Sequence, residues 1–182
     1  MSYDSGATRS RLLDAAYAEF VERGLAGARV DRIASAASAN KQAIYAYFGS
    51  KDALFDAVLD SRLRVLADLV PFTPHDLPAY TGALFDRLDA DPGLVRLTQW
   101  KALERPGASE AELAAHLDKA QSLADARGIT LEAGIDAMMF ALAAAQSWNS
   151  TAGSIRNPVG DDEAARKARH RAAVIAAVAA AA

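Results

Sequence analysis

A short segment near the N-terminus gathers side chains of the kinds that contact nucleic acid. Lysine can donate to guanine O6 and N7, glutamine can pair with adenine through two hydrogen bonds, and an alanine methyl can meet the methyl of thymine. Tyrosine hydroxyls and lysine ammonium groups also suit phosphate oxygens. Residues 40–51 include Lys41, Gln42, Ala43, Tyr45, Tyr47 and Lys51. We therefore predict that this segment contacts double-stranded DNA.

Two short helices must position these side chains. The pattern predicts helices over residues 30–36 and 40–48, joined by a tight turn, with Asn40 capping the second. Helices of this length are not stable alone, so a longer helix over residues 8–23, with Thr8 as its expected N-cap, must support them. The apolar residues that would bury the shared side are Leu13, Phe20, Ile33, Ala34, Ala37, Ile44 and Phe48. This arrangement is a helix-turn-helix, whose second short helix enters the DNA major groove with its N-terminus first.

The helix-turn-helix gives the exposed residues separate expected roles. The three residues of the first turn after Asn40 would meet base edges. Lys51 would share a phosphate with the free N–H groups of the helix that Ser50 caps. Each role has an ordinary alternative. Tyr45 could pack inside the DNA-binding head, the group formed by these three helices. Lys41 and the other polar residues could be plain surface residues.

The chain as a whole is predicted to be all-α, with about nine helices. Its 182 residues are 52% hydrophobic and 24% charged, which is typical of a globular protein, and glycine and proline lie between the periodic segments. Prolines cluster between residues 71 and 78. We expect a DNA-binding domain over residues 1–51 and a helical domain over residues 52–182. The helices expected in the second domain span residues 51–69, 77–89, 92–105, 109–127 and 130–150, with a last helix capped by Asp161.

The charge is distributed unevenly along the chain. The net charge is −3, yet residues 1–51 hold seven basic and five acidic residues, against 13 basic and 18 acidic residues in the remainder. Such a split suggests two parts with different partners. The basic excess of the first part is small, so it permits a nucleic-acid partner without requiring one.

One pattern of residues in the N-terminal third of the chain is specific enough to be compared with a known protein family. It consists of Leu12-Leu13-Asp14-Ala15-Ala16 followed by Phe20, Arg23 and Gly24, then Ile33-Ala34-x-x-Ala37, and finally Ile44-Tyr45-x-Tyr47-Phe48-x-Ser50-Lys51-x-x-Leu54. With this order and spacing, the stretch from Arg9 to Leu59 resembles the N-terminal domain of the tetracycline-repressor (TetR) family of bacterial transcriptional regulators.

The resemblance implies a function. Family members bind a pseudo-palindromic operator as homodimers, and a small molecule bound in the C-terminal body commonly releases the DNA, so a ligand-responsive repressor is expected. By position, Tyr45 and Lys51 match residues that commonly touch phosphate. The residues that match the base-reading surface are Lys41, Gln42, Ala43 and Tyr47. Half-sites about one helical turn apart are expected where a dimer reads adjacent grooves.

Two positions depart from the family pattern. Arg29 stands where the family usually has a Thr or Ser that caps the second helix, so an arginine could reach a phosphate but the cap must come from elsewhere. Ser38 stands where the turn usually has Gly. A left-handed backbone there would cost Ser about 1 kcal/mol relative to Gly.

The second domain offers weaker candidates. Large apolar side chains with a few amides are typical of pockets for apolar small molecules, although any of them could instead belong to the core. The candidate pocket residues are Phe85, Gln99, Trp100, Met138, Met139, Gln146, Trp148 and Asn149. Small residues on the last long helices could form a dimer contact, or pack within one chain. These are Ala141, Ala145, Ala168, Ala172, Ile175 and Ala179.

Other classes of function are less well supported. The chain has no cysteine, no Gly-rich phosphate loop, no GxSxG or HExxH motif, and its three histidines lack metal-binding spacing, so we expect no enzyme, cofactor or metal site. No apolar run reaches the roughly 20 residues of a membrane span, so a cytoplasmic protein without a membrane partner is expected. A DNA-binding regulator without a small-molecule ligand stays as the alternative.

Overall fold

The computed structural model describes residues 4–160 and 162–181, and the described chain is helical with no strand. The all-α prediction is confirmed, with ten helices in this part where about nine were expected. The additional helix is α9, a four-residue turn at Gly153–Arg156. The other helices are α1 (Asp4–Gly27), α2 (Val30–Ala36), α3 (Lys41–Phe48), α4 (Lys51–Leu69), α5 (Leu77–Ala90), α6 (Pro92–Glu104), α7 (Glu110–Arg127), α8 (Leu131–Ser150) and α10 (Glu163–Ala181).

The helices form two compact units. The first unit consists of the chain up to Leu66 together with Arg96–Gly107. The second unit consists of Ala67–Val95 and the chain from Ala108 onward. The first unit therefore extends beyond residue 51 through most of α4 and also contains the C-terminal part of α6. The helices α4 and α6 each contribute residues to both units.

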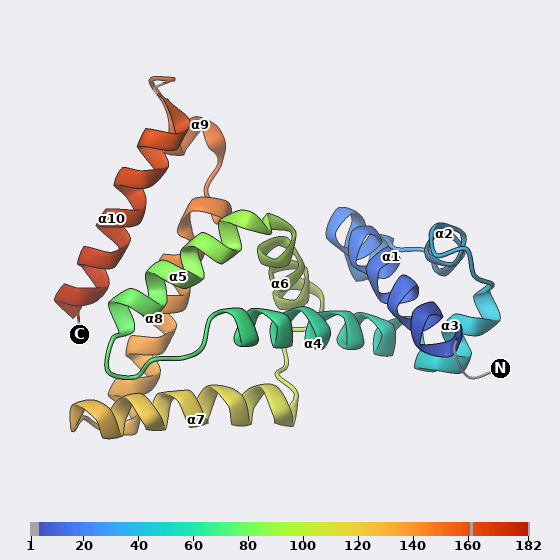
Figure 1. Cartoon of the computed structure of the whole chain (residues 1–182), viewed down its shortest axis with the longest axis horizontal. Coiled ribbons are helices and arrows are strands. Elements are labelled where there is room, and N and C mark those ends of the chain that lie inside the picture. Colours follow the sequence, from blue (N-terminus) through green and yellow to red (C-terminus); the bar gives the residue numbers. More distant parts are fainter. Residues whose placement is uncertain (1–3, 161, 182) are drawn as a thin grey trace. The chain divides into compact units, whose positions relative to one another are not determined.

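The core of the first unit explains how two short helices are held. Phe20 of α1 and Phe55 of α4 are fully buried and meet edge to face, with ring centroids 5.0 Å apart. Ile33 of α2 and Ile44 of α3 are fully buried in the same cluster, so each short helix is fastened by its apolar side. Figure 1 shows α1, α2 and α3 gathered as one group of helices at the N-terminal end of the colour scale.

Most predicted helix ends are confirmed. Asn40 accepts from the N–H of Ala43 at 2.8 Å, and Ser50 and Thr130 accept in the same way at 3.0 and 3.2 Å. The N-cap expected at Thr8 is wrong, because α1 begins at Asp4 and Thr8 lies inside it. Asp161 lies outside the described residues.

In the second unit, α5, α8 and α10 pack side by side and α7 packs across α8 (Figure 1). The helices α8 and α10 run antiparallel, since Ser147 hydrogen-bonds His170 at 2.8 Å near one end while Ala137 and Val178 line one groove near the other. Gly134 allows the close approach of α7 and α8, because a Cβ there would lie 2.5 Å from the Ala120 carbonyl oxygen. No single described helix has the length and apolar composition of a membrane span; α7 and α8 reach it only as a pair bent by 112°.

The turn between α2 and α3 contains a strained residue. Ser38 has φ of 50°, the one positive φ among the described non-glycine residues. A Ser38→Gly substitution is therefore expected to raise the free energy of unfolding by about 0.5–1 kcal/mol, because glycine occupies this region without a Cβ penalty. Urea unfolding measures the change. Ser35→Gly, inside α2, is the matched control and should lower stability by about 0.5 kcal/mol; equal effects at both positions would contradict the strain at Ser38.

Candidate DNA-binding interface

The first turn of α3 presents polar side chains to solvent. Ile44 anchors the helix in the core, and Asn40 caps its N-terminus through the Ala43 N–H. This anchoring leaves Lys41 and Gln42 exposed, and Ala43, the next residue, is half-buried. The structure thus brings the three expected base-reading residues together at the free N-terminal end of the helix, where a groove-inserted helix meets base edges.

Two tyrosines extend this surface along α3. Tyr45 is 45% exposed and Tyr47 38% exposed. Both rings are therefore partly supported by the head while leaving surface open to a partner. Arg9 of α1 lies over the ring of Phe48, 5.2 Å from its centroid, which adds an exposed positive charge beside the C-terminal end of α3. Arg9 is not among the contact residues expected from the sequence.

Two lysines of the interface form weak interactions within the chain: Lys41 an exposed ion pair, and Lys51 a hydrogen bond to a backbone carbonyl. Lys41 Nζ lies 3.2 Å from an Asp31 carboxylate oxygen, and both side chains are largely exposed. Such a pair contributes at most about 1 kcal/mol, so DNA phosphates or bases can displace it. Lys51 Nζ donates to the carbonyl oxygen of Ala28 at 3.2 Å, which places its ammonium group beside the start of α2. Arg29, the next residue, is exposed at the same place.

Glu19 supplies the cap that α2 lacks. The N-cap residue Arg29 makes no side-chain capping hydrogen bond. Instead, Glu19 Oε1 accepts from the backbone N–H of Arg29 at 2.9 Å and from Arg32 Nε at 2.7 Å, and also pairs with Arg32 Nη2. A carboxylate at the start of a helix satisfies free N–H groups and suits the positive end of the helix dipole. Glu19 is ten residues from Arg29 in sequence, so no local capping pattern could have identified it.

The environment of Glu19 favours its charged form. Burial of the carboxyl works to raise its pKa, but hydrogen bonds from Arg32 and from the Arg29 N–H, and then the charges of Arg32 and Arg23, outweigh burial and lower the pKa below 4.5. Its stabilising contribution is therefore fully present above pH 4.5 and is lost as the pH falls through the lowered folded-state pKa.

The candidate pocket residues of the sequence analysis are dispersed. Phe85, Met138 and Trp148 are buried in the core of the second unit, Gln146 is half-buried, and Met139 is 64% exposed. Asn149, also in the second unit, donates to the Leu88 carbonyl oxygen at 3.1 Å. Gln99 and Trp100 lie in the first unit, where Gln99 is exposed and Trp100 donates to the Val21 carbonyl oxygen at 3.3 Å.

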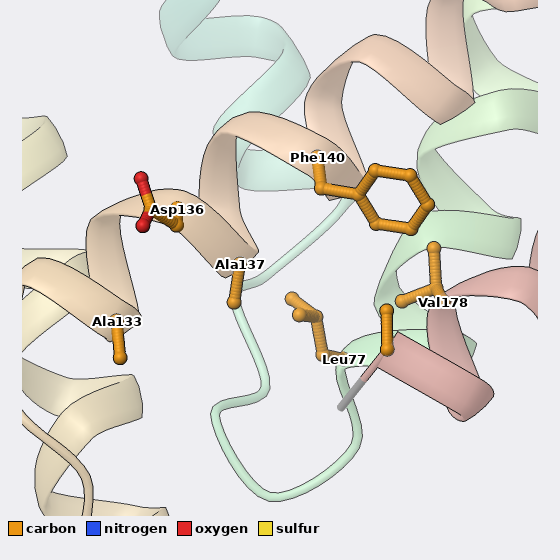
Figure 2. Close-up of a pocket in the computed structure, with 7 residues that line it drawn as sticks. Leu77, Ala133, Asp136, Ala137, Phe140 and Val178 are labelled. Carbon is orange, nitrogen blue, oxygen red and sulfur yellow. The ribbon is translucent and has the colours of Figure 1, made fainter.

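A groove in the second unit lies elsewhere. It has a volume of about 300 Å³ and is partly open, and its only charged lining residue is Asp136 (Figure 2). In Figure 2 the ring of Phe140 and the side chain of Val178 face each other across its apolar part, away from Asp136. The lining residues are Leu77, Ala133, Asp136, Ala137, Phe140, Val178 and Ala181. None of the eight candidate pocket residues named above lines this groove.

The expected dimer residues divide into two groups. Ala141 and Ala145 have no exposed surface, so they pack within the chain against its own helices. Ala168, Ala172 and Ala179 are exposed on α10, and Ile175 is half-buried. Small residues on the inner side of α8 therefore serve packing inside the subunit. Among the residues that the structure describes, no group of three or more His, Asp or Glu side chains could hold a metal ion.

A Glu19→Gln substitution tests the cap of α2. It is expected to lower the free energy of unfolding by about 1–3 kcal/mol at pH 7, because the Arg29 N–H and the Arg32 guanidinium lose a buried anionic acceptor. Urea unfolding at pH 7 and at several values below pH 4.5 measures the difference from wild type, which should shrink in acid as Glu19 itself becomes protonated. Glu22→Gln, at an exposed carboxylate, is the control and should change stability by no more than about 0.5 kcal/mol. A pH-independent difference would count against this role of Glu19.

Comparison with known proteins agrees with this geometry. The family model described as bacterial regulatory proteins, tetR family, matches residues 12–58. A second model, the tetracyclin repressor-like C-terminal domain, matches residues 76–179, more than half of the chain. The two matched segments correspond to the helix-turn-helix with its supporting helices and to the helices from α5 to α10.

Relatives extend over different parts of the chain. The HTH-type transcriptional repressor SCO4008 of Streptomyces coelicolor is 48% identical over 101 residues, which cover 56% of this chain and about half, 53%, of that repressor. The crystal structure of SCO4942 from Streptomyces coelicolor, a candidate transcriptional regulator, matches with a TM-score of 0.77 and 34% identity over 92% of this chain and 96% of that one. The fatty acid degradation regulator FadR from Bacillus halodurans shares the fold, with a TM-score of 0.66 and 18% identity over 92% and 94% of the two chains.

The motif, the helix-turn-helix geometry and both family models lead to one assignment. The chain belongs to the TetR family of helix-turn-helix transcriptional regulators.

Proposed function

We propose that this chain is a transcriptional repressor that binds a pseudo-palindromic DNA operator as a homodimer and is released by a small molecule bound in its second unit. The observation that carries the proposal is the exposed first turn of α3, where Lys41 and Gln42 stand free of the core while Ile44 anchors the helix. The repression part of the proposal draws on SCO4008, which is described as a repressor.

DNA recognition follows from the chemistry of the exposed groups. Gln42 would form two hydrogen bonds with an adenine, Lys41 would leave Asp31 for a guanine, and Ala43 would meet a thymine methyl. Tyr47 would contact a base edge and Tyr45 a phosphate oxygen. These contacts require only that α3 lie in the major groove with its capped end inward.

Phosphate binding has its own place in the head. Lys51 and Arg29 lie together at the start of α2, since the Lys51 ammonium already reaches the Ala28 carbonyl oxygen. The N–H groups at the start of α4 are close to Lys51 along the chain and add positive potential. One DNA phosphate could therefore replace the weak Ala28 contact and be held by the ammonium and guanidinium groups.

The outer face of α8 and α10 supports a homodimer. Its α10 part from Ala172 to Ala181 carries no charge, and its exposed residues include Ala172, Ala176 and Ala179. Small side chains let helices of two subunits approach closely. A second subunit can bury this apolar helix face, and removal of apolar surface from water lowers the free energy of the system.

Charged residues also differ between the two ends of the α8–α10 pair. Because α8 and α10 are antiparallel, the acidic residues Glu132 and Asp136 lie at one end of the pair, whereas Arg166 lies at the other end. A two-fold axis through the middle of the face would place the acidic end of one copy on the basic end of the other. The groove of Figure 2 opens at the acidic end, where apolar side chains of the partner could enter between Phe140 and Val178.

The effector is proposed to be a mostly apolar small molecule. The second unit offers many apolar and aromatic side chains with few charges, and pockets for such molecules commonly have this lining. A regulator that needs no small molecule would show the same head and the same dimer face, so the effector is the part of the proposal that needs its own ligand screen.

One experiment tests DNA binding and assembly together. DNA sequences bound by the protein are selected from a random duplex pool, and the mass of the protein–DNA species is measured at the same time. A pseudo-palindrome recovered with two subunits, or a pair of dimers, supports the proposal. Recovery of no common sequence, with only weak binding that salt abolishes, would contradict it.

Lys51→Ala should weaken binding to all sequences alike. The ammonium group is expected to contact phosphate, so its removal should lower the slope of log affinity against log salt concentration by about one unit. Titrations of operator and unrelated duplexes at several salt concentrations measure both quantities. Lys101→Ala removes the same charge from α6, which is not part of the helix-turn-helix. An equal slope change in both variants would refute the phosphate role.

Gln42→Ala should instead change the preferred sequence. Loss of a bidentate adenine contact is expected to relax preference at one position of each half-site by about 1–3 kcal/mol, while binding to unrelated DNA stays nearly constant. Repeating the selection with the variant gives the position directly. An unchanged preference at every position would remove Gln42 from the base-reading set.

A further inference from the structure

The helix α1 is broken just before the helix-turn-helix. Gly24 has φ of 67° and ψ of −179°, which are not helical, and the last turn from Leu25 to Gly27 follows as a separate piece. In an unbroken helix, the Leu25 N–H would bond to the Val21 carbonyl and the Ala26 N–H to the Glu22 carbonyl. A break at this place leaves these two donors and two acceptors in need of other partners.

Three side chains of α6 supply those partners. Glu104 Oε2 accepts from the N–H of Leu25 at 2.7 Å and from the N–H of Ala26 at 3.0 Å. Trp100 Nε1 donates to the Val21 carbonyl oxygen at 3.3 Å, and Arg96 Nη2 donates to the Glu22 carbonyl oxygen at 3.4 Å. Because Arg96, Trp100 and Glu104 are four residues apart, they form one stripe along α6. We call these three residues the α6 stripe.

The α6 stripe lies directly against the break. A Cβ on Gly24 would lie 2.7 Å from Glu104 Oε1 and 2.9 Å from two carbon atoms of the Trp100 ring. Only glycine therefore fits between the two side chains, and its positive φ is open to glycine without strain. The positive φ of Gly24 and the close approach of Trp100 and Glu104 to it are therefore linked: a different α1 backbone at Gly24 would require these two side chains to move.

The same part of α6 has further anchors in the head. Leu97 is fully buried in the core that holds α2 and α3. Arg105, directly after α6, lies 3.2 Å from an Asp56 carboxylate oxygen and donates to the Asp52 backbone carbonyl at 3.4 Å, both on α4. Leu97 and Arg105 lie outside residues 12–58, which the DNA-binding family model covers. The first turn of α6, Pro92–Val95, belongs to the second unit.

The break is connected to the DNA-contact residues by very little chain. Ala28, whose carbonyl accepts from Lys51, and Arg29, whose N–H is bound by Glu19, follow the broken turn at once. A change in the direction of Leu25–Gly27 would move both residues and the start of α2 with them. If the α6 stripe left, the freed N–H groups could bond back to Val21 and Glu22, so the broken and closed forms of α1 satisfy the same backbone groups.

We propose that the α6 stripe is a set of positioning residues for DNA recognition: it holds α1 in its broken form and thereby sets the start of α2 for operator binding. Movement of α6 away from α1 would allow α1 to close into a continuous helix and would misplace Arg29 and the Lys51 site. This inference rests on the proposed DNA binding and adds a route by which a change in the second unit reaches the head, through α6, whose first turn lies in that unit.

The test compares two variants that remove the same charge. Glu104→Ala should reduce operator affinity about tenfold or more, because coupling between sites in proteins commonly has this size. Asp60→Ala, at an exposed carboxylate of α4, should leave the affinity unchanged or raise it slightly, since removal of a negative charge favours DNA. Glu104→Gln keeps an acceptor oxygen and should restore most of the affinity. Equal affinities for Glu104→Ala and Asp60→Ala would overturn the proposal.

A second readout needs no DNA. The backbone chemical shifts of Val21–Gly27 in Glu104→Ala should move towards those of a continuous helix, and the indole N–H resonance of Trp100 should move with them. Unchanged shifts in a variant of a protein that does select an operator would overturn the positioning role, whereas failure of the wild-type protein to select an operator would overturn the proposed function. If thermal unfolding shows that Glu104→Ala does not fold, Trp100→Phe, which keeps an aromatic ring but loses the N–H, carries the affinity measurement and the backbone shifts of Val21–Gly27 with the same expected directions.

Discussion

The DNA-reading geometry depends on the burial of two helices that cannot exist alone. The helices α2 and α3 have seven and eight residues, well below the length at which an isolated helix is stable in water. Ile33 and Ile44 fasten them to the aromatic core formed by Phe20 and Phe55. Because each short helix buries its apolar side in this core, the opposite side of α3 is polar and exposed to solvent. The same packing that stabilises α3 thus exposes Lys41 and Gln42 at its end.

The electrostatics of the head separate structural charges from available ones. Glu19 is only 10% exposed and is held between Arg32 and the start of α2, so its charge serves the fold. Lys41 and its partner Asp31 are exposed, and half-buried Lys51 donates to the Ala28 backbone carbonyl. Desolvation makes a buried pair costly to open, whereas water already screens the exposed contacts. We therefore expect a phosphate to be bound by Lys41 and Lys51 while the α2 cap stays intact.

The sequence predicted features that depend on neighbours along the chain and missed those that depend on distant ones. The caps at Asn40, Ser50 and Thr130 were found because each accepts from an N–H three residues later. Glu19 was missed because it is ten residues from the N–H that it caps, and the role of Trp100 was missed because Val21 is 79 residues away. An aromatic residue in an apolar helix gave no sign of which surface it would meet, so a ligand pocket and a packing contact were equally compatible with Trp100. Burial of Ala141 and Ala145 was open for the same reason.

Backbone hydrogen bonding links these distant contacts to the interface. A helix-turn-helix needs the chain to change direction sharply between α1 and α2, and each change leaves backbone groups without helical partners. Buried or half-buried groups of this kind must find other partners, and here Glu19 and Glu104 are both recruited from outside the affected turn. A sharp change of chain direction leaves more backbone groups without helical partners, so it depends more on side chains from elsewhere in the fold. The proposed sensitivity of the DNA-contact surface to α6 would follow directly from the way the backbone groups at the break in α1 are hydrogen-bonded.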